Sequence, residues 1–100
     1  MSFRLTRKAK EDLLKIYTDG VEAFGFQEAE RYQDKIDNSI TIIGDNPEIA
    51  SLRTEATPPV RIHPVGVHVI VYHLDDEGLP IILRVRSARE NWIENPAGDA

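Results

Sequence analysis

The chain has 100 residues, with 12 Lys and Arg against 17 Asp and Glu and no cysteine. This length fits one domain, and the lack of cysteine excludes disulfides and thiolate chemistry. The net charge of −5 argues against a protein whose main task is to grip a phosphate backbone, because Lys and Arg supply most of that affinity. There is no run of about 18 apolar residues to predict a membrane span, and no signal-peptide pattern. We therefore expect a cytoplasmic protein with no membrane partner.

The first half of the chain predicts a short strand and two helices. Residues 3–5 alternate as a strand does, and Thr6 is a candidate N-cap for the segment that follows. Apolar or small residues spaced three and four apart predict helices over residues 7–24 and 27–43. Gly25 is placed to end the first helix, and so short a link favours an antiparallel hairpin.

The second half predicts a sheet. Residues 48–59 have the composition of a loop, and strands are expected at residues 60–63, 67–74 and 81–87. Strands joined by such short turns pair as antiparallel neighbours. The predicted fold is α+β: an N-terminal strand, an antiparallel helical hairpin and then a three-stranded antiparallel sheet. We expect a single domain over residues 1–94 and a mobile tail at 95–100.

The last predicted strand carries two arginines. Alternation predicts Leu83, Val85 and Ser87 on one face of this strand and Arg84 and Arg86 on the other. A third arginine, Arg89, follows directly, and between residues 53 and 89 every basic residue apart from histidine is an arginine. Adjacent guanidinium groups suit a surface that holds carboxylate or phosphate. The competing interpretation is an ordinary sheet face with surface arginines.

Two aromatic residues leave alternatives open. Tyr72 is expected either in the core or at the edge of a groove. Trp92 either folds back onto the core or stands exposed as an anchor for a partner, since Trp and Arg dominate interface hot spots. Tyr17 and Tyr32 lie on the helical stripes and are expected in the core.

The titratable residues do not form a recognisable catalytic or metal-binding pattern. His63, His68 and His73 lack the spacing and accompanying ligands of a metal site, so structural or surface roles are expected. The Glu11–Asp12 pair is expected on a solvated helix face. We therefore expect no catalytic residue, no metal and no cofactor.

Several short patterns together resemble the ParE branch of the ParE/RelE toxin superfamily. The matching segments are Thr6-x-x-Ala9-x-x-Asp12-Leu13, Val60-Arg61, Gly66-x-His68-x-Ile70-x-Tyr72 and Ile82-Leu83-Arg84-Val85, together with a second helix that ends in Asn-Pro. The resemblance implies a bacterial toxin of a type II toxin–antitoxin system, held inactive by a ParD-like antitoxin in a hetero-oligomer. It also implies non-catalytic inhibition of DNA gyrase, with operator DNA contacted only through the antitoxin.

The alternative within the superfamily is a ribosome-dependent mRNA endonuclease of RelE type. The chain has Ser87 where relatives often carry His, and a serine cannot act as a general acid near neutral pH without an activating base. A partner protein without toxicity is a second alternative. The candidate surface for gyrase or antitoxin contact carries Arg61, Arg84, Arg86 and Arg89, with Trp92 and Tyr72 nearby.

Overall fold

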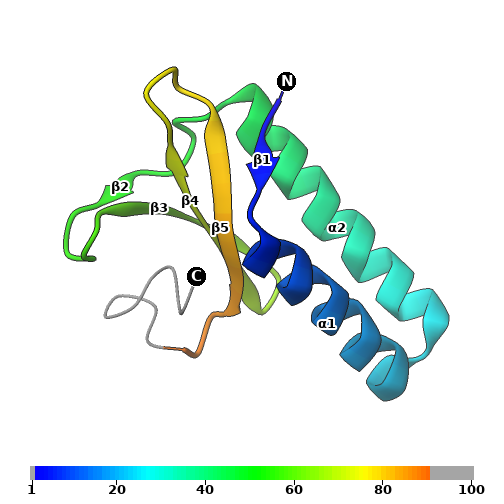
Figure 1. Cartoon of the computed structure of the whole chain (residues 1–100). Helices are drawn as coiled ribbons and strands as arrows, with labels where there is room; N and C mark the ends of the chain where they lie inside the picture. Colours follow the sequence, from blue (N-terminus) through cyan, green and yellow to red (C-terminus); the bar gives the residue numbers. More distant parts are fainter. Residues whose placement is uncertain (1, 91–100) are drawn as a thin grey trace.

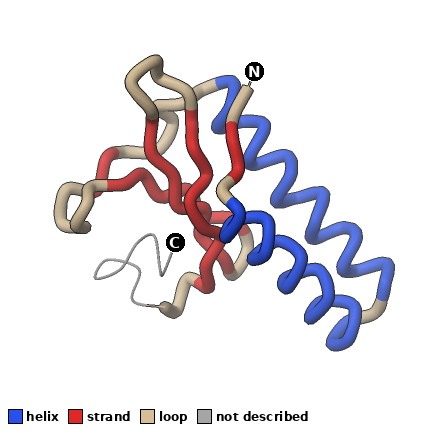
Figure 2. The backbone as a smooth tube through the Cα atoms, in the orientation of Figure 1, coloured by secondary structure: helices blue, strands red, loops and turns tan. Residues whose placement is uncertain are grey.

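The computed structural model describes residues 2–90 of the chain. Its elements are β1 (Arg4–Leu5), α1 (Arg7–Phe24), α2 (Phe26–Asp45), β2 (Leu52–Arg53), β3 (Val60–Val65), β4 (His68–Leu74) and β5 (Pro80–Ser87). The two helices lie together on one side of a single sheet (Figures 1 and 2). Trp92 and the predicted tail at 95–100 lie outside the described residues. In the described part of the chain, neither helix has the length and apolar character that a membrane crossing requires.

The helical hairpin confirms the prediction closely. The Thr6 side chain accepts a hydrogen bond from the Ala9 N–H and so caps α1. Gly25 alone links the helices, with a φ of +89°, and its N–H donates to the Val21 carbonyl. Glycine adopts such a φ without the steric cost that a side chain would add. The end of the hairpin where α1 meets α2 extends beyond the sheet (Figure 1).

The sheet is larger than the predicted one and is mixed. Its strand order is β1-β5-β4-β3-β2, and the β3, β4 and β5 ladder is antiparallel as predicted. β1 adds a parallel pair at the edge of β5, and β2 adds an antiparallel pair to β3. The segment 48–59 was expected to be loop throughout, so β2 corrects that prediction. The α+β class and the order of elements are confirmed.

A bulge in β5 corrects the predicted alternation of its side chains. Val71 pairs with Arg84 and the next residue, Tyr72, pairs with Ile82, so Leu83 is the extra residue. Leu83 packs against the cluster that contains Val71, whereas Val85 belongs to the cluster on the other face. The prediction that Leu83 and Val85 share a face was therefore wrong.

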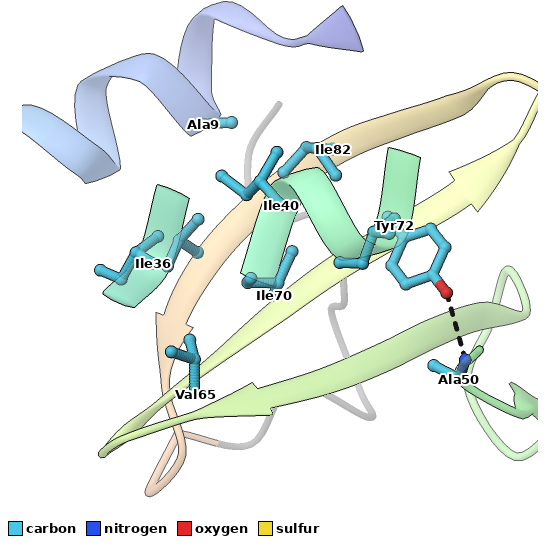
Figure 3. Packing of buried hydrophobic residues seen from close by; sticks show 10 residues of the cluster. Ala9, Ile36, Ile40, Ala50, Val65, Ile70, Tyr72 and Ile82 are labelled. Carbon is cyan, nitrogen blue, oxygen red and sulfur yellow. Dashed lines mark hydrogen bonds between the residues drawn. The ribbon is translucent and has the colours of Figure 1, made fainter. Parts of the chain in front are cut away.

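The main core lies between the helices and the sheet. Ile36 and Ile40 of α2 meet Ile70 and Ile82 of the sheet, and all four are buried (Figure 3). A smaller cluster of Ala56, Val60, Val69 and Val71 lies on the opposite face of the sheet. Each fully buried aliphatic side chain contributes about 1.5–3 kcal/mol, so the larger cluster is the main anchor of the hairpin.

Candidate functional site

The arginines of the predicted surface do not share one face of the sheet. Arg61 pairs across the strands with Tyr72, which belongs to the cluster under the helices. Arg86 pairs with Val69, which belongs to the cluster on the other face. Cross-strand partners point to the same side, so Arg61 and Arg86 point to opposite sides. The prediction of a single arginine face was wrong in this respect.

Arg84 is held by a carboxylate of α1. Its Nε and Nη2 donate to the two oxygens of Asp12 at 2.6 and 2.9 Å, and Asp12 also accepts the backbone N–H of Val85 at 3.0 Å. The two side chains retain only 19% and 16% of their exposure. Asp12 was expected on a solvated helix face, and this was wrong because its carboxylate closes onto β5.

The Thr-x-x-Ala-x-x-Asp pattern is thereby explained as a clamp between α1 and β5. Thr6 donates its hydroxyl to the Leu83 carbonyl at 2.8 Å, and Ala9 is completely buried. Residues three apart lie on one helix face, so Thr6, Ala9 and Asp12 all meet the same strand. The same three residues are part of the pattern on which the family resemblance rests, so this part of the pattern has a structural explanation.

Arg86 pairs with a carboxylate beyond the end of β5. Its guanidinium donates to Glu90 at 2.8 and 3.1 Å, and Glu90 also accepts the Ser87 N–H at 3.1 Å. The hydrogen bond from Arg86, supported by the Ser87 N–H, lowers the pKa of Glu90 below its ordinary value. Arg89 is exposed, and its backbone N–H donates to the Ser87 hydroxyl. A binding role for these arginines stays a prediction.

Tyr72 and Arg61 fix the connection between α2 and β2. Tyr72 is completely buried; its hydroxyl donates to the Pro47 carbonyl at 2.9 Å and accepts the Ala50 N–H at 3.3 Å (Figure 3). Arg61 donates to the carbonyl of Ala50. Burial raises the pKa of Tyr72. Of the two alternatives for Tyr72, the core is therefore correct.

An apolar groove lies between the helical hairpin and the turn that leads into β4. It has a volume of about 700 Å³. Its apolar lining comes from both helices and from this turn, and includes Ile16, Tyr17, Ala23, Phe24, Ala29 and Val67. Phe24 and Val67 are 75% and 70% exposed. Exposed apolar side chains in an open groove are typical of surfaces that bind a partner or a ligand.

One polar pair interrupts the apolar lining. The Tyr32 hydroxyl lies 2.6 Å from Nδ1 of His68, donates to the Val65 carbonyl at 3.2 Å and accepts the Val67 N–H at 3.1 Å. Gly66 passes so close that a Cβ there would lie 2.6 Å from the Tyr32 hydroxyl. The turn, α2 and β4 are thus tied together at the groove.

The sequence carried a usable signal for Asp12 but not for the groove. Asp12 lies three residues after Ala9 on the face that the apolar stripe assigns to the core, which could have placed it against the sheet. Tyr32 and His68 are separated by 36 residues. Their contact depends on how the hairpin docks, which no local pattern encodes.

Comparison with known proteins agrees with the architecture. The sequence model described as the ParE toxin of the type II toxin–antitoxin system parDE matches residues 3–92, and the chain therefore belongs to this toxin family. A solved structure titled "Chromosomal ParDE TA system from P. aeruginosa" contains a chain of the same fold, with a TM-score of 0.75 and 24% identity. The match covers 87% of this chain and 95% of that one. A search of curated proteins gave no match.

Proposed function

We propose that this ParE-family toxin is neutralised by a ParD-like antitoxin, and that an amphipathic helix of the antitoxin docks in the groove beside Phe24 and Val67. The observation that carries the proposal is an open apolar groove between the hairpin and the turn before β4. Helix-in-groove recognition uses apolar anchors spaced three and four apart, which a groove between helices accommodates.

The edges of the sheet support docking in the groove over strand addition. The pairing of β1 with β5 ends at Ile82. Beyond this point, the backbone of β5 forms hydrogen bonds with the side chains of Thr6, Asp12 and Glu90. At the other edge, Pro64 of β3 has no N–H to offer. Covered edges and prolines disfavour pairing with a further strand.

We further propose that the toxin acts by binding and inhibiting DNA gyrase without catalysis. We infer the gyrase target from family membership. The candidate arginines on β5 are already bonded to carboxylates, which supports a mode of action without catalysis. Arg84 is bonded to Asp12, and Arg86 to Glu90. Arg89 is exposed and follows these two arginines in the sequence, so we assign the gyrase contact first to Arg89, together with Trp92.

The groove is tested by placing a charge on its rim. We expect Val67→Glu and Phe24→Glu to weaken binding of the antitoxin encoded beside the toxin gene by at least about tenfold, because a buried carboxylate replaces an apolar anchor. Leu14→Glu is the matched control, since Leu14 is 67% exposed on α1 but does not line the groove. Isothermal titration calorimetry measures all three. Equal affinities for the four proteins would contradict the assigned groove.

The target is tested separately from the antitoxin. Purified toxin should block supercoiling of relaxed plasmid by purified gyrase, and added antitoxin should restore it. A translation extract programmed with one mRNA supplies the opposite test. Discrete cleavage within codons, with unaffected gyrase, would replace the proposal with the mRNA endonuclease alternative.

A further inference from the structure

His68 is held in one hydrogen-bonding arrangement by the residues around the Tyr32 hydroxyl. A hydroxyl has one hydrogen and two acceptor positions. Tyr32 donates to the Val65 carbonyl and accepts from the Val67 N–H, so one acceptor position is left for the third contact, Nδ1 of His68 at 2.6 Å. All three contacts are satisfied together when Nδ1 carries a hydrogen.

This arrangement restricts where His68 can change its protonation. With the hydrogen retained on Nδ1, the ring gains or loses a proton at Nε2, which has no hydrogen-bond partner within residues 2–90. His68 lines the groove, so a docked apolar helix would cover this nitrogen and remove it from water. A buried polar nitrogen without a partner is unfavourable, which requires the docked helix to supply one.

The charges around the groove favour an acidic partner group. The two acids of the rim are already paired, Asp19 with Lys15 and Glu28 with Arg31. Lys35 also lines the groove, and within residues 2–90 it has no ion pair. The uncompensated charge at this rim is therefore positive.

The surroundings of His68 shift its pKa in opposite directions. Burial is the larger effect and lowers its pKa below the ordinary value of 6.5, so the free toxin carries neutral His68 at neutral pH. Glu90, beyond β5, and Asp12, on α1, raise the pKa by their negative charge. From α2, Tyr32 donates no proton to the ring in the arrangement above, and Lys35 lines the same groove. A further carboxylate next to Nε2 would favour the imidazolium.

We propose that His68 recognises an Asp or Glu side chain of the docked antitoxin helix, and that filling the groove binds one proton at Nε2. This inference rests on the proposed function and adds to it a specificity position within the groove. A helix that places an apolar residue over His68 is rejected because it leaves Nε2 unpaired. Antitoxins of related systems that lack the acidic residue are discriminated in the same way.

The test is calorimetric titration of full-length toxin with the neighbouring-gene antitoxin at pH 6, 7 and 8, in phosphate and in Tris. The different ionisation enthalpies of the two buffers report the protons exchanged on binding. We expect uptake of up to about one proton, and an affinity that strengthens by up to about tenfold for each unit of pH decrease. His68→Gln should abolish both effects. His73→Gln is the matched control, because His73 is on the same strand but is exposed and outside the groove, and it should retain them.

A second measurement does not depend on a variant that folds. Long-range ¹H–¹⁵N spectra of the wild-type toxin should show Nδ1 protonated in the free state, and the pKa of His68 should be higher in the complex than in the free toxin. Tight binding without proton uptake, or with proton release, would overturn this inference and leave the groove assignment intact. Absence of binding at every pH would overturn both.

Discussion

Gly66 illustrates how one residue position links the turn to the groove. Its φ is +57°, and an added Cβ would lie 2.6 Å from both the hydroxyl and a ring carbon of Tyr32. Real Cβ atoms do not approach this closely, so the Tyr32 ring would have to move. Because the ring is tied to Val65, Val67 and His68, its movement would disturb the groove as well as the turn.

An alanine in the left-handed backbone conformation costs about 1 kcal/mol of stability. We therefore expect Gly66→Ala to destabilise the toxin by more than this amount, because the Tyr32 ring must also move. Gly78 provides the matched comparison, because its φ is +84° but nothing lies within 4 Å of an added Cβ. Urea denaturation of both variants measures the difference. Equal losses for Gly66→Ala and Gly78→Ala would show that Tyr32 yields without cost.

Residue patterns predicted what is local and failed where a contact joins distant parts of the chain. Thr6 as N-cap and Gly25 as the link were visible in the sequence, because both act on neighbouring residues. The partnership of Asp12 with Arg84 spans 72 residues, and Arg84 directly follows the bulge at Leu83. An insertion of one residue in a strand leaves no periodic trace in so short a segment.

The clamp between α1 and β5 is the contact whose loss should be most costly among the ion pairs of the described residues. In Asp12→Ala, Arg84 loses a bidentate partner and the Val85 N–H loses its acceptor. We expect a loss of about 2–3 kcal/mol, as for hydrogen bonds to a partly buried charge. Denaturant unfolding measures the change in the free energy of unfolding.

Asp19→Ala is the control for the clamp. Asp19 also pairs with a cation, Lys15, at 2.9 Å, but both side chains are more than half exposed. An exposed pair four residues apart on a helix contributes about 0.3–0.5 kcal/mol. Losses of similar size in the two variants would show that Asp12 is no more than a surface charge.

The strands show the same division between local and distant information as the residues. The helices and the three long strands follow from periodicity, and their bounds were predicted within a few residues. β1 and β2 each have two paired residues, and both depend on a longer strand to supply the partner. Two residues are too few to define a period, and Leu52–Arg53 lies within a segment of loop composition, so the sequence does not predict β2.

Protonation should affect the whole molecule in two separate steps. Burial lowers the pKa of His68 in the folded toxin, whereas the unfolded chain keeps the ordinary value of 6.5. The unfolded state therefore binds more protons as the pH falls below 6.5, and stability decreases until the pH reaches the folded pKa. The hydrogen bonds of Glu90 and Asp75 lower their pKa values, so these carboxylates contribute stability above their ordinary values of 4.5 and 3.8 and lose it in more acidic solution.

We expect the free energy of unfolding of the free toxin to fall as the pH drops through 6.5, and to fall again below about pH 4.5. His68→Gln should remove the first decrease and keep the second, and His73→Gln should keep both. Urea titrations from pH 8 to pH 3 measure the two steps. A rise in stability between pH 7 and 6 would mean that the fold favours the imidazolium, contrary to the burial of His68. The free toxin and the complex should thus respond oppositely to mild acid, because the imidazolium weakens the empty groove and gains its partner only when the acidic helix is bound.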